Sequence, residues 1–119
     1  MRVAERVLVW ERAPAGSHVD MTLLSAAAMR RTNRRATGRR GLTDVIAYAL
    51  PQPDGRLLGD VYICPAAAAN GGSDLKDELV RLAVHGTLHV LGYDHPEGSG
   101  RTRSEMWRLQ ERYVKRLLR

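Results

Sequence analysis

The sequence predicts an α/β fold class (α+β), because strand-like and helix-like segments both occur along the chain. Two short apolar runs are separated by a Pro-Asp-Gly turn at 53–55. Two longer segments, 74–91 and 102–119, place apolar residues three or four positions apart, as helices do. With 119 residues, of which 44% are hydrophobic, we expect a single domain, 1–119, with a modest core.

The first third of the chain carries the weaker signals. The short apolar run Val7–Trp10 predicts a strand, and breakers follow it at Pro14 and Gly16. From Asp20 to about Asn33 the spacing predicts a helix with one buried stripe. The stripe consists of Leu23, Leu24, Ala27 and Ala28.

The middle of the chain predicts a hairpin. Residues 45–48 have the composition of a strand that ends at Pro51, and residues 57–64 that of a second strand. Pro fixes φ, Asp bonds locally and Gly tolerates positive φ, so the Pro-Asp-Gly segment between them predicts a turn.

Two helices are expected in the last third. The loop Asn70–Gly72 precedes Ser73, a predicted N-cap for a helix from Asp74 to about Leu91. Its apolar face consists of Leu75, Leu79, Leu82 and Val84. A final helix from about Thr102 to the end buries Met106, Leu109, Tyr113 and Leu117.

Three of the four histidines lie close together at the end of the first of these helices. His85 and His89 are four residues apart, so a helix presents both imidazoles on one face. Gly92 can end the helix and let the chain bring His95 to the same point. Three imidazoles with one open position are typical of a catalytic zinc site, so we expect one Zn²⁺ per chain. Asp94 could orient a ligand.

The alternative is that these histidines are ordinary surface residues, but a third histidine just past a helix-ending glycine argues against it. The spacing is that of the metzincin proteases, H-E-x-x-H-x-x-G-x-x-H. Gly86 stands where those enzymes carry the glutamate that acts as general base. A peptidase is therefore disfavoured, and the metal could instead serve phosphodiester hydrolysis.

The net charge of +6 favours a polyanionic partner. The densest basic segment is 30–40, which contains no acidic residue. Within it, the candidate RNA-binding residues are Arg34, Arg35, Arg39 and Arg40, because guanidinium groups bind phosphate oxygens. The alternative is a solvated helix end in a chain that is rich in arginine throughout.

The histidine segment His85–His95 resembles the H-G-x-L-H-x-x-G-Y-D-H pattern of the YbeY family of bacterial metallo-endoribonucleases, and it meets that pattern at every fixed position. Thr43–Tyr48 is similar to the family's T-D-V-L-S-F, and Leu58–Ile63 to its L-G-D-I-x-I. Asn33 matches the family's asparagine, and Glu105 with Met106 matches the start of its last helix. The likeness covers Asn33 to about Met106.

The resemblance implies a small mixed sheet packed on helices, with a central metal-binding helix that carries the zinc-ligating histidines. It implies cleavage of single-stranded RNA in 3′-end maturation of small-subunit ribosomal RNA and in ribosome quality control. The implied partners are single-stranded or ribosomal RNA and the small ribosomal subunit.

Two features depart from the family pattern. Counted back from Thr43, the position of a functionally important family arginine is Thr37 here. Residues 1–32 are short and divergent from the family's opening elements. The alternative function is therefore a non-catalytic, metal-stabilised factor that associates with the ribosome.

The remaining expectations are simpler. Cys64 is the only cysteine, so no disulfide partner exists within the chain, and no apolar segment suits a membrane or a signal peptide. We expect a cytoplasmic protein. Asp44 and Asp60 could act near the metal, although structural roles are favoured for both. His18 is expected to be exposed, and Trp10 and Trp107 to serve packing.

Overall fold

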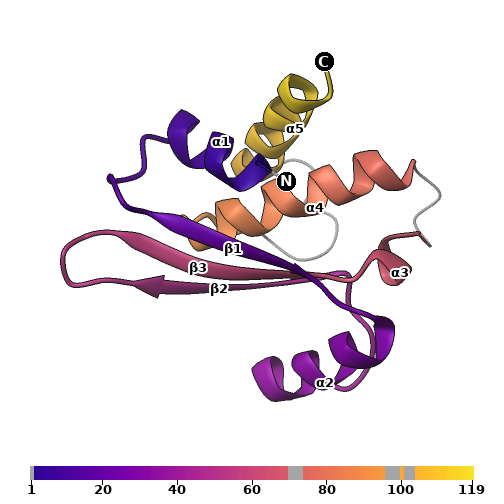
Figure 1. Ribbon diagram of the computed structural model, residues 1–119. Coiled ribbons are helices and arrows are strands. Elements are labelled where there is room, and N and C mark those ends of the chain that lie inside the picture. Colours follow the sequence, from indigo (N-terminus) through magenta and orange to yellow (C-terminus); the bar gives the residue numbers. More distant parts are fainter. Residues whose placement is uncertain (1, 70–73, 96–99, 101–103) are drawn as a thin grey trace.

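The computed structural model describes residues 2–69, 74–95, 100 and 104–119 (Figure 1). Its elements are α1 (Val3–Trp10), β1 (His18–Leu23), α2 (Ala26–Thr37), β2 (Val45–Pro51), β3 (Leu57–Ile63), α3 (Pro65–Ala68), α4 (Leu75–Val90) and α5 (Glu105–Leu118). The strands form one mixed sheet of order β1-β3-β2, in which β1 is parallel and β2 antiparallel to β3. The expected α/β (α+β) class, with a small mixed sheet packed on helices, is confirmed.

The predicted hairpin is β2 and β3. Val45 pairs with Ile63 at one end of the ladder and Pro51 with Leu57 at the other. In the turn, Gly55 has a φ of +91°, which a residue with a side chain rarely adopts. The prediction succeeded because the turn residues specify this geometry locally.

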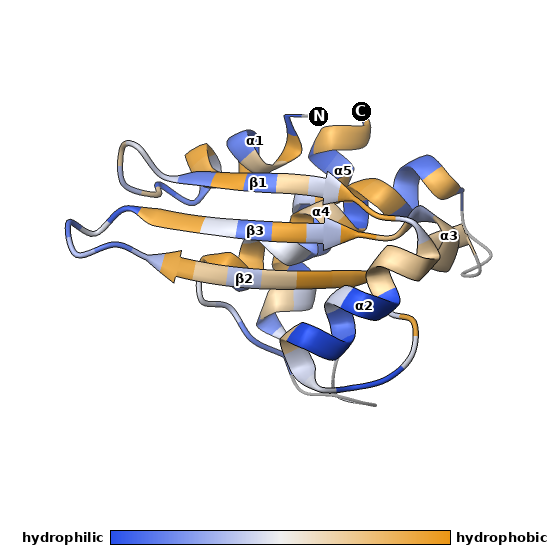
Figure 2. Ribbon diagram, turned by 60° about the horizontal axis from the view of Figure 1, so that its bottom comes forward, coloured by the Kyte–Doolittle hydropathy of each residue, from blue (hydrophilic) through white to orange (hydrophobic). Residues whose placement is uncertain are grey.

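Helix α4 covers one face of the sheet (Figure 1). Helix α1 packs against both α4 and strand β1, whereas α5 packs against α4. The main core fills this region with apolar side chains from all of these elements, among them Val61 and Leu88. Helix α2 lies on the other side of the sheet, near one end of the strands (Figure 2). There Met29 packs with Ile46 and Cys64 in a second, smaller cluster. The metal-binding helix predicted at the centre is therefore α4.

The segment predicted as a strand, Val7–Trp10, is instead the second half of helix α1. Val3, Ala4, Val7 and Leu8 are buried, while Val9 is 74% exposed. Burial at positions three or four apart is the helical pattern, and the prediction failed because it considered only the contiguous apolar run.

The single helix predicted from Asp20 to Asn33 is also wrong in its first part. Residues His18–Leu23 form strand β1, which pairs in parallel with β3. Helix α2 begins only after Ser25, whose hydroxyl accepts a hydrogen bond from the Ala28 amide at 3.2 Å. Pairing with a distant strand overrides local helical spacing here. The buried residues of α2 are Met29 and Asn33 rather than the predicted stripe.

The two C-terminal helices are confirmed with small shifts at their starts. Asp74 is the N-cap of α4, and its carboxylate accepts from the amides of Lys76 and Asp77. The predicted cap Ser73 and the predicted loop Asn70–Gly72 lie outside the described residues.

Helix α5 starts at Glu105 rather than near Thr102, which also lies outside the described residues. Ser104 is its N-cap and accepts a hydrogen bond from the Trp107 amide at 3.1 Å. Within the described part of the chain, no helix combines the length and the apolar character that a membrane crossing requires.

Candidate metal centre

Helix α4 presents His85 and His89 to one point. His85 is only 7% exposed, whereas His89 is half-buried. Their rings meet edge to face, with centroids 4.6 Å apart. This arrangement is the direct result of a four-residue separation on a helix.

The end of α4 redirects the chain so that His95 joins them. The Gly92 amide donates to the His89 carbonyl and the Tyr93 amide to the Leu88 carbonyl, both at 3.0 Å. This pair of bonds is a Schellman motif, and it requires a left-handed residue at Gly92, whose φ is +100°. The ring of His95 then lies 5.0 Å from that of His85, centroid to centroid.

A carboxylate at the C-terminal end of α1 stabilises this bend. Glu11 accepts a hydrogen bond from the Tyr93 hydroxyl at 2.5 Å and another from the Tyr113 hydroxyl of α5. The hydrogen bond to Glu11 raises the pKa of Tyr93 to about 12, and burial together with the same carboxylate raises that of Tyr113 to about 12. The N-terminal segment therefore supports the turn that carries His95.

The three histidines fit a single divalent ion. One ring nitrogen from each of His85, His89 and His95 lies within 4.8 Å of the other two. The Nε2 atoms of His85 and His89 are 3.1 Å apart. Two nitrogens bound to one tetrahedral zinc at its usual bond lengths are separated by roughly 3.3 Å. The predicted convergence is found, whereas binding of an ion by these residues stays a prediction.

Gln110 is a candidate site residue that the sequence did not predict. It comes from α5, is 1% exposed, and its Oε1 lies 2.7 Å from Nδ1 of His85. Because an amide oxygen can only accept, Nδ1 of His85 must carry the proton, which leaves the Nε2 lone pair for a metal. The signal available in the sequence was a polar residue on the apolar stripe of α5.

The amide of Gln110 is fixed in turn by a charged network. Its Nε2 donates to Glu111 at 3.0 Å, and Arg81 of α4 binds the same carboxylate through two nitrogens. Arg81 also pairs with Glu78 at 3.2 Å. Burial alone would raise the pKa of Glu111, but hydrogen bonds from Arg81 and Gln110 outweigh it and hold that pKa below its ordinary value. The network keeps the amide oxygen directed at His85.

A groove of about 750 Å³ opens in front of the three histidines. It is lined on its other side by the end of α2, the following loop and β2, including Asn33, Thr37, Arg39 and Arg40. Two of the four predicted RNA-binding arginines, Arg39 and Arg40, therefore share a groove with the three histidines. The groove combines cations with three imidazoles, which suits an anionic ligand.

Asn33 and Thr37 shape the loop that carries those arginines. The buried amide of Asn33 donates to the Gly41 carbonyl at 3.2 Å, and its Oδ1 accepts from the Thr37 hydroxyl at 2.9 Å. That hydroxyl also accepts from the Arg39 amide at 3.1 Å. Thr37, which stands where the family pattern has an arginine, thus has a structural role in the loop.

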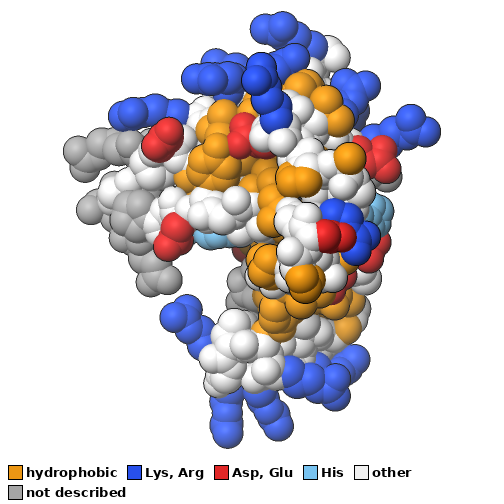
Figure 3. Space-filling model, turned by 90° about the vertical axis from the view of Figure 1, so that its left-hand side faces the viewer, with side chains coloured by type: hydrophobic (Ala, Val, Ile, Leu, Met, Phe, Trp, Pro, Cys, Tyr) orange, Lys and Arg blue, Asp and Glu red, His pale blue; other side chains and the backbone are white. Residues whose placement is uncertain are grey.

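The other two predicted arginines, Arg34 and Arg35, lie on α2 and line a neighbouring depression of about 520 Å³. Arg40 lines both this depression and the groove. In Figure 3, Lys and Arg side chains gather at two opposite ends of the molecule, with histidine visible in the hollow between them. The basic surface of α2 is thus continuous with the groove that contains the histidines.

The structure explains why a peptidase glutamate is missing at Gly86. A Cβ atom built on this residue would lie 2.6 Å from Cγ1 of Val61, because α4 packs closely on β3 at this point. Any side chain at Gly86 would therefore collide with the sheet. The general base of a metzincin cannot be accommodated here.

The remaining residues that the sequence singled out can be placed one by one. Asp94 accepts a hydrogen bond from the His95 amide at 2.8 Å, so it orders the backbone of that residue. His18 is exposed, as expected, and pairs with Asp20. Trp10 packs on Tyr113, as expected.

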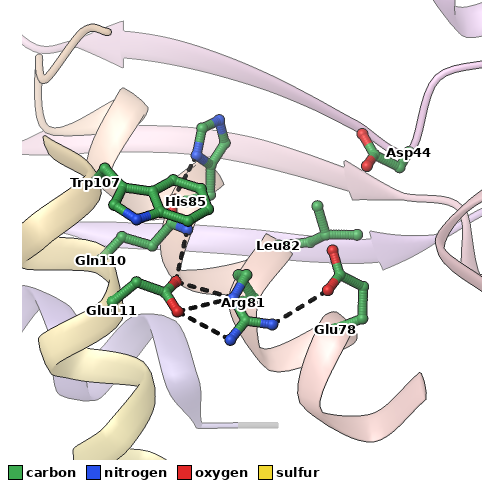
Figure 4. Close-up of a pocket in the computed structure, with 8 residues that line it drawn as sticks. All are labelled: Asp44, Glu78, Arg81, Leu82, His85, Trp107, Gln110 and Glu111. Carbon is green, nitrogen blue, oxygen red and sulfur yellow. Dashed lines mark hydrogen bonds and ion pairs between the residues drawn. The ribbon is translucent and has the colours of Figure 1, made fainter. Parts of the chain in front are cut away.

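Asp60 lies in the middle of β3 and does not line the histidine groove. Asp44 differs, because it lines a second cavity that also reaches His85 (Figure 4).

A sequence model described as Endoribonuclease YbeY matches residues 1–118, so the similarity extends well beyond the interval Asn33–Met106. A protein of that description from Micrococcus luteus is 37% identical over 128 residues, covering 98% of this chain and 78% of its own. Another, from Mycobacterium ulcerans, is 36% identical over 114 residues, covering 83% of this chain and 63% of its own. The chain thus spans less than two thirds of the length of that mycobacterial relative.

The fold also resembles a solved structure. The solution structure of a Thermotoga maritima protein aligns with a TM-score of 0.63 at 28% identity, covering 96% of this chain and 75% of that one.

Proposed function

The chain belongs to the YbeY family of endoribonucleases, and from this premise we propose that it is a metal-dependent endoribonuclease whose ion is held by His85, His89 and His95. The observation that carries the proposal is the convergence of three imidazole nitrogens within 4.8 Å of one another. Zinc is the proposed ion, because three neutral imidazoles with an open position suit it.

The chemistry of the donor set supports hydrolysis. A bound zinc ion would polarise a phosphoryl oxygen and activate water, the two contributions that phosphodiester cleavage needs. Gln110 holds His85 in the tautomer with Nε2 available. Gly92 and Asp94 set the backbone that carries His95.

Arginines on the opposite wall of the groove would hold the RNA backbone. Arg39 and Arg40 line the same groove as the three histidines. Guanidinium groups bind phosphate oxygens in bidentate fashion, so these residues would orient a phosphodiester against the metal centre. Arg34 and Arg35 would extend the contact along the strand over α2.

The family resemblance supports single-stranded RNA as substrate, and in particular 3′-end maturation of small-subunit ribosomal RNA and ribosome quality control in the cytoplasm. The small ribosomal subunit is the proposed partner.

A second function is favoured by one observation, the threonine at position 37 where the family pattern has an arginine. The chain would then be a non-catalytic ribosome-associated factor that uses the metal for stability.

The two functions are distinguished by metal analysis combined with cleavage of labelled single-stranded and duplex RNA. We expect about one equivalent of zinc per chain and preferential cleavage of the single strand. His85→Ala should lose both the bound zinc and the cleavage activity. His95→Ala should do the same, and it is a second test because His95 is less buried than His85. His18→Ala is the matched control, because His18 is exposed and lies away from the groove.

Full cleavage by metal-stripped protein would overturn the enzymatic function. Co-sedimentation of His95→Ala with ribosomes, together with no cleavage by the wild type, would favour the second function.

A further inference from the structure

The cavity behind His85 differs in chemistry from the groove in front of it. It measures about 350 Å³, within the range of small-molecule sites. Figure 4 shows Trp107, Gln110 and Glu111 projecting into this region from α5, with Arg81 and His85 on α4. Asp44, just before β2, completes the lining. His85 lines both cavities, so the two adjoin at a candidate metal ligand.

The charge of this cavity excludes a phosphate group. Its lining carries three carboxylates, from Asp44, Glu78 and Glu111, against the single guanidinium of Arg81. That guanidinium is already bound by Glu78 and Glu111. The phosphate backbone of an RNA strand would therefore stay in the basic groove, and of the parts of an RNA strand only the uncharged bases and sugars could enter the acidic cavity.

The geometry also disfavours a second metal ion in this cavity. Among the residues that the structure describes, His85, His89 and His95 are the one group of three or more potential ligands whose atoms converge within 4.8 Å. The three carboxylates of the cavity do not meet at a common point. Two of them are engaged with Arg81, which itself carries a positive charge.

We propose, on the basis of the endoribonuclease function above, that this cavity is a nucleobase pocket which takes the base beside the phosphodiester held at the metal centre, with a preference for guanine. The half-buried indole of Trp107 forms a flat wall of the kind on which unstacked bases pack. This assigns Trp107 a role in binding, whereas the sequence indicated packing alone.

The preference for guanine follows from Asp44. This half-buried carboxylate lines the cavity, and no side chain among the described residues hydrogen bonds to it. A carboxylate accepts two parallel hydrogen bonds. The Watson–Crick edge of guanine offers two adjacent donors, N1–H and the N2 amino group, whereas the other three bases offer no such adjacent pair.

Two measurements test the pocket. The first is titration of the zinc-loaded protein with each of the four nucleosides, which carry no phosphate, followed by NMR. We expect guanosine to bind at least about tenfold more tightly than the others, the discrimination that a bidentate contact provides. The second is mapping of cleavage sites on an RNA that presents all bases, where cuts should cluster beside guanosine.

The informative variant is Asp44→Asn, which keeps the shape of the side chain but replaces one acceptor with a donor. It should abolish the guanosine preference in both measurements while retaining one equivalent of metal. Trp107→Leu should weaken the binding of all four nucleosides to a similar extent. The matched control is Asp54→Asn, an exposed turn carboxylate paired with Arg56 on the hairpin, which should preserve the preference.

The outcomes separate the pocket from the proposed function. Guanosine binding that depends on Asp44, in a protein that cuts no RNA, would support the proposed nucleobase pocket and contradict the proposed endoribonuclease function. Metal-dependent cleavage without any base preference, in binding or in cut sites, would overturn the pocket alone. Loss of metal from Asp44→Asn would also overturn it, since the carboxylate would then serve the metal centre.

Discussion

The amide oxygen of Gln110 lies 2.7 Å from Nδ1 of His85, which joins the last helix of the chain to a candidate metal ligand 25 residues earlier. The contact is buried on both sides, since the two residues are 1% and 7% exposed. A buried acceptor in this position fixes both the tautomer and the direction of the ring.

Replacing Gln110 by methionine should weaken metal binding by about 10- to 100-fold, the usual effect of losing such a partner. Methionine fills similar space but cannot accept the proton of Nδ1. Gln110→Glu retains an acceptor, so its metal affinity should lie closer to that of the wild type. Competition with a chelator measures the affinity, and Leu109→Met on the same helix is the control. Equal affinities for Gln110→Met and the wild type would show that the contact has no such role.

Gly86→Ala should lower the free energy of unfolding by about 1–3 kcal/mol, because the added methyl group overpacks the interface between α4 and β3. The clash is with Val61, which is fully buried. The double variant Gly86→Ala/Val61→Ala should therefore lose less unfolding free energy than the two single variants lose together, by at least about 0.5 kcal/mol. Urea denaturation measures all four proteins, and strict additivity would contradict the proposed clash.

The Tyr93 phenol should give the protein a stability that disappears at high pH. Its pKa is raised from 10 to about 12, first by the hydrogen bond to Glu11 and then by burial. The protonated phenol is favoured in the folded state, so the contribution is complete below pH 10 and is lost as pH rises through 12.

Tyr93→Phe should therefore be less stable than the wild type below pH 10, and the difference should narrow as the pH rises from 10 to 12. Denaturation at several pH values measures this. In an absorbance titration of phenolate, Glu11→Gln should bring the pKa of Tyr93 toward 10. Glu5→Gln is the control, because Glu5 is an exposed carboxylate in α1, the helix that ends just before Glu11. An unchanged titration in Glu11→Gln would contradict the assigned cause.

Arg39→Gln and Arg40→Gln should each weaken the binding of single-stranded RNA and reduce its salt dependence. For each phosphate that a variant no longer binds, the slope of log K against log salt should fall by about 0.7. Fluorescence anisotropy with a non-cleavable RNA measures both quantities. Arg56→Gln is the control, because Arg56 is paired with Asp54 on the hairpin. A similar fall in the control would mean that only total charge matters.

The parts of this molecule that local chemistry specifies were predictable from the sequence. The Pro-Asp-Gly turn, the helix end at Gly92 and the meeting of His85 with His89 each depend on residues within a few positions of one another. The elements whose structure depends on contacts with distant parts of the chain were not predictable. Strand β1 forms because it pairs with β3, about 40 residues away, and its spacing alone indicated a helix.

The same distinction applies within the site. The histidines were found because their spacing is informative, whereas Gln110 and Asp44 reach the neighbourhood of His85 only through the packing of α5 and the start of β2 against α4. Neither residue belongs to a comparable spacing pattern. Asp44 was only one of two aspartates that the sequence offered as candidates near the metal, and a structural role was favoured for it.

The carboxylate of Glu11 is shared by Tyr93 and Tyr113, and the second of these hydrogen bonds joins residues 102 positions apart. During synthesis, Glu11 leaves the ribosome long before its second partner is made. The support behind the His95 bend is therefore complete only once α5 has been translated and has docked. Until then the bend that carries His95 lacks part of its support in the nascent chain. Stable binding of the ion should therefore be among the last steps of folding.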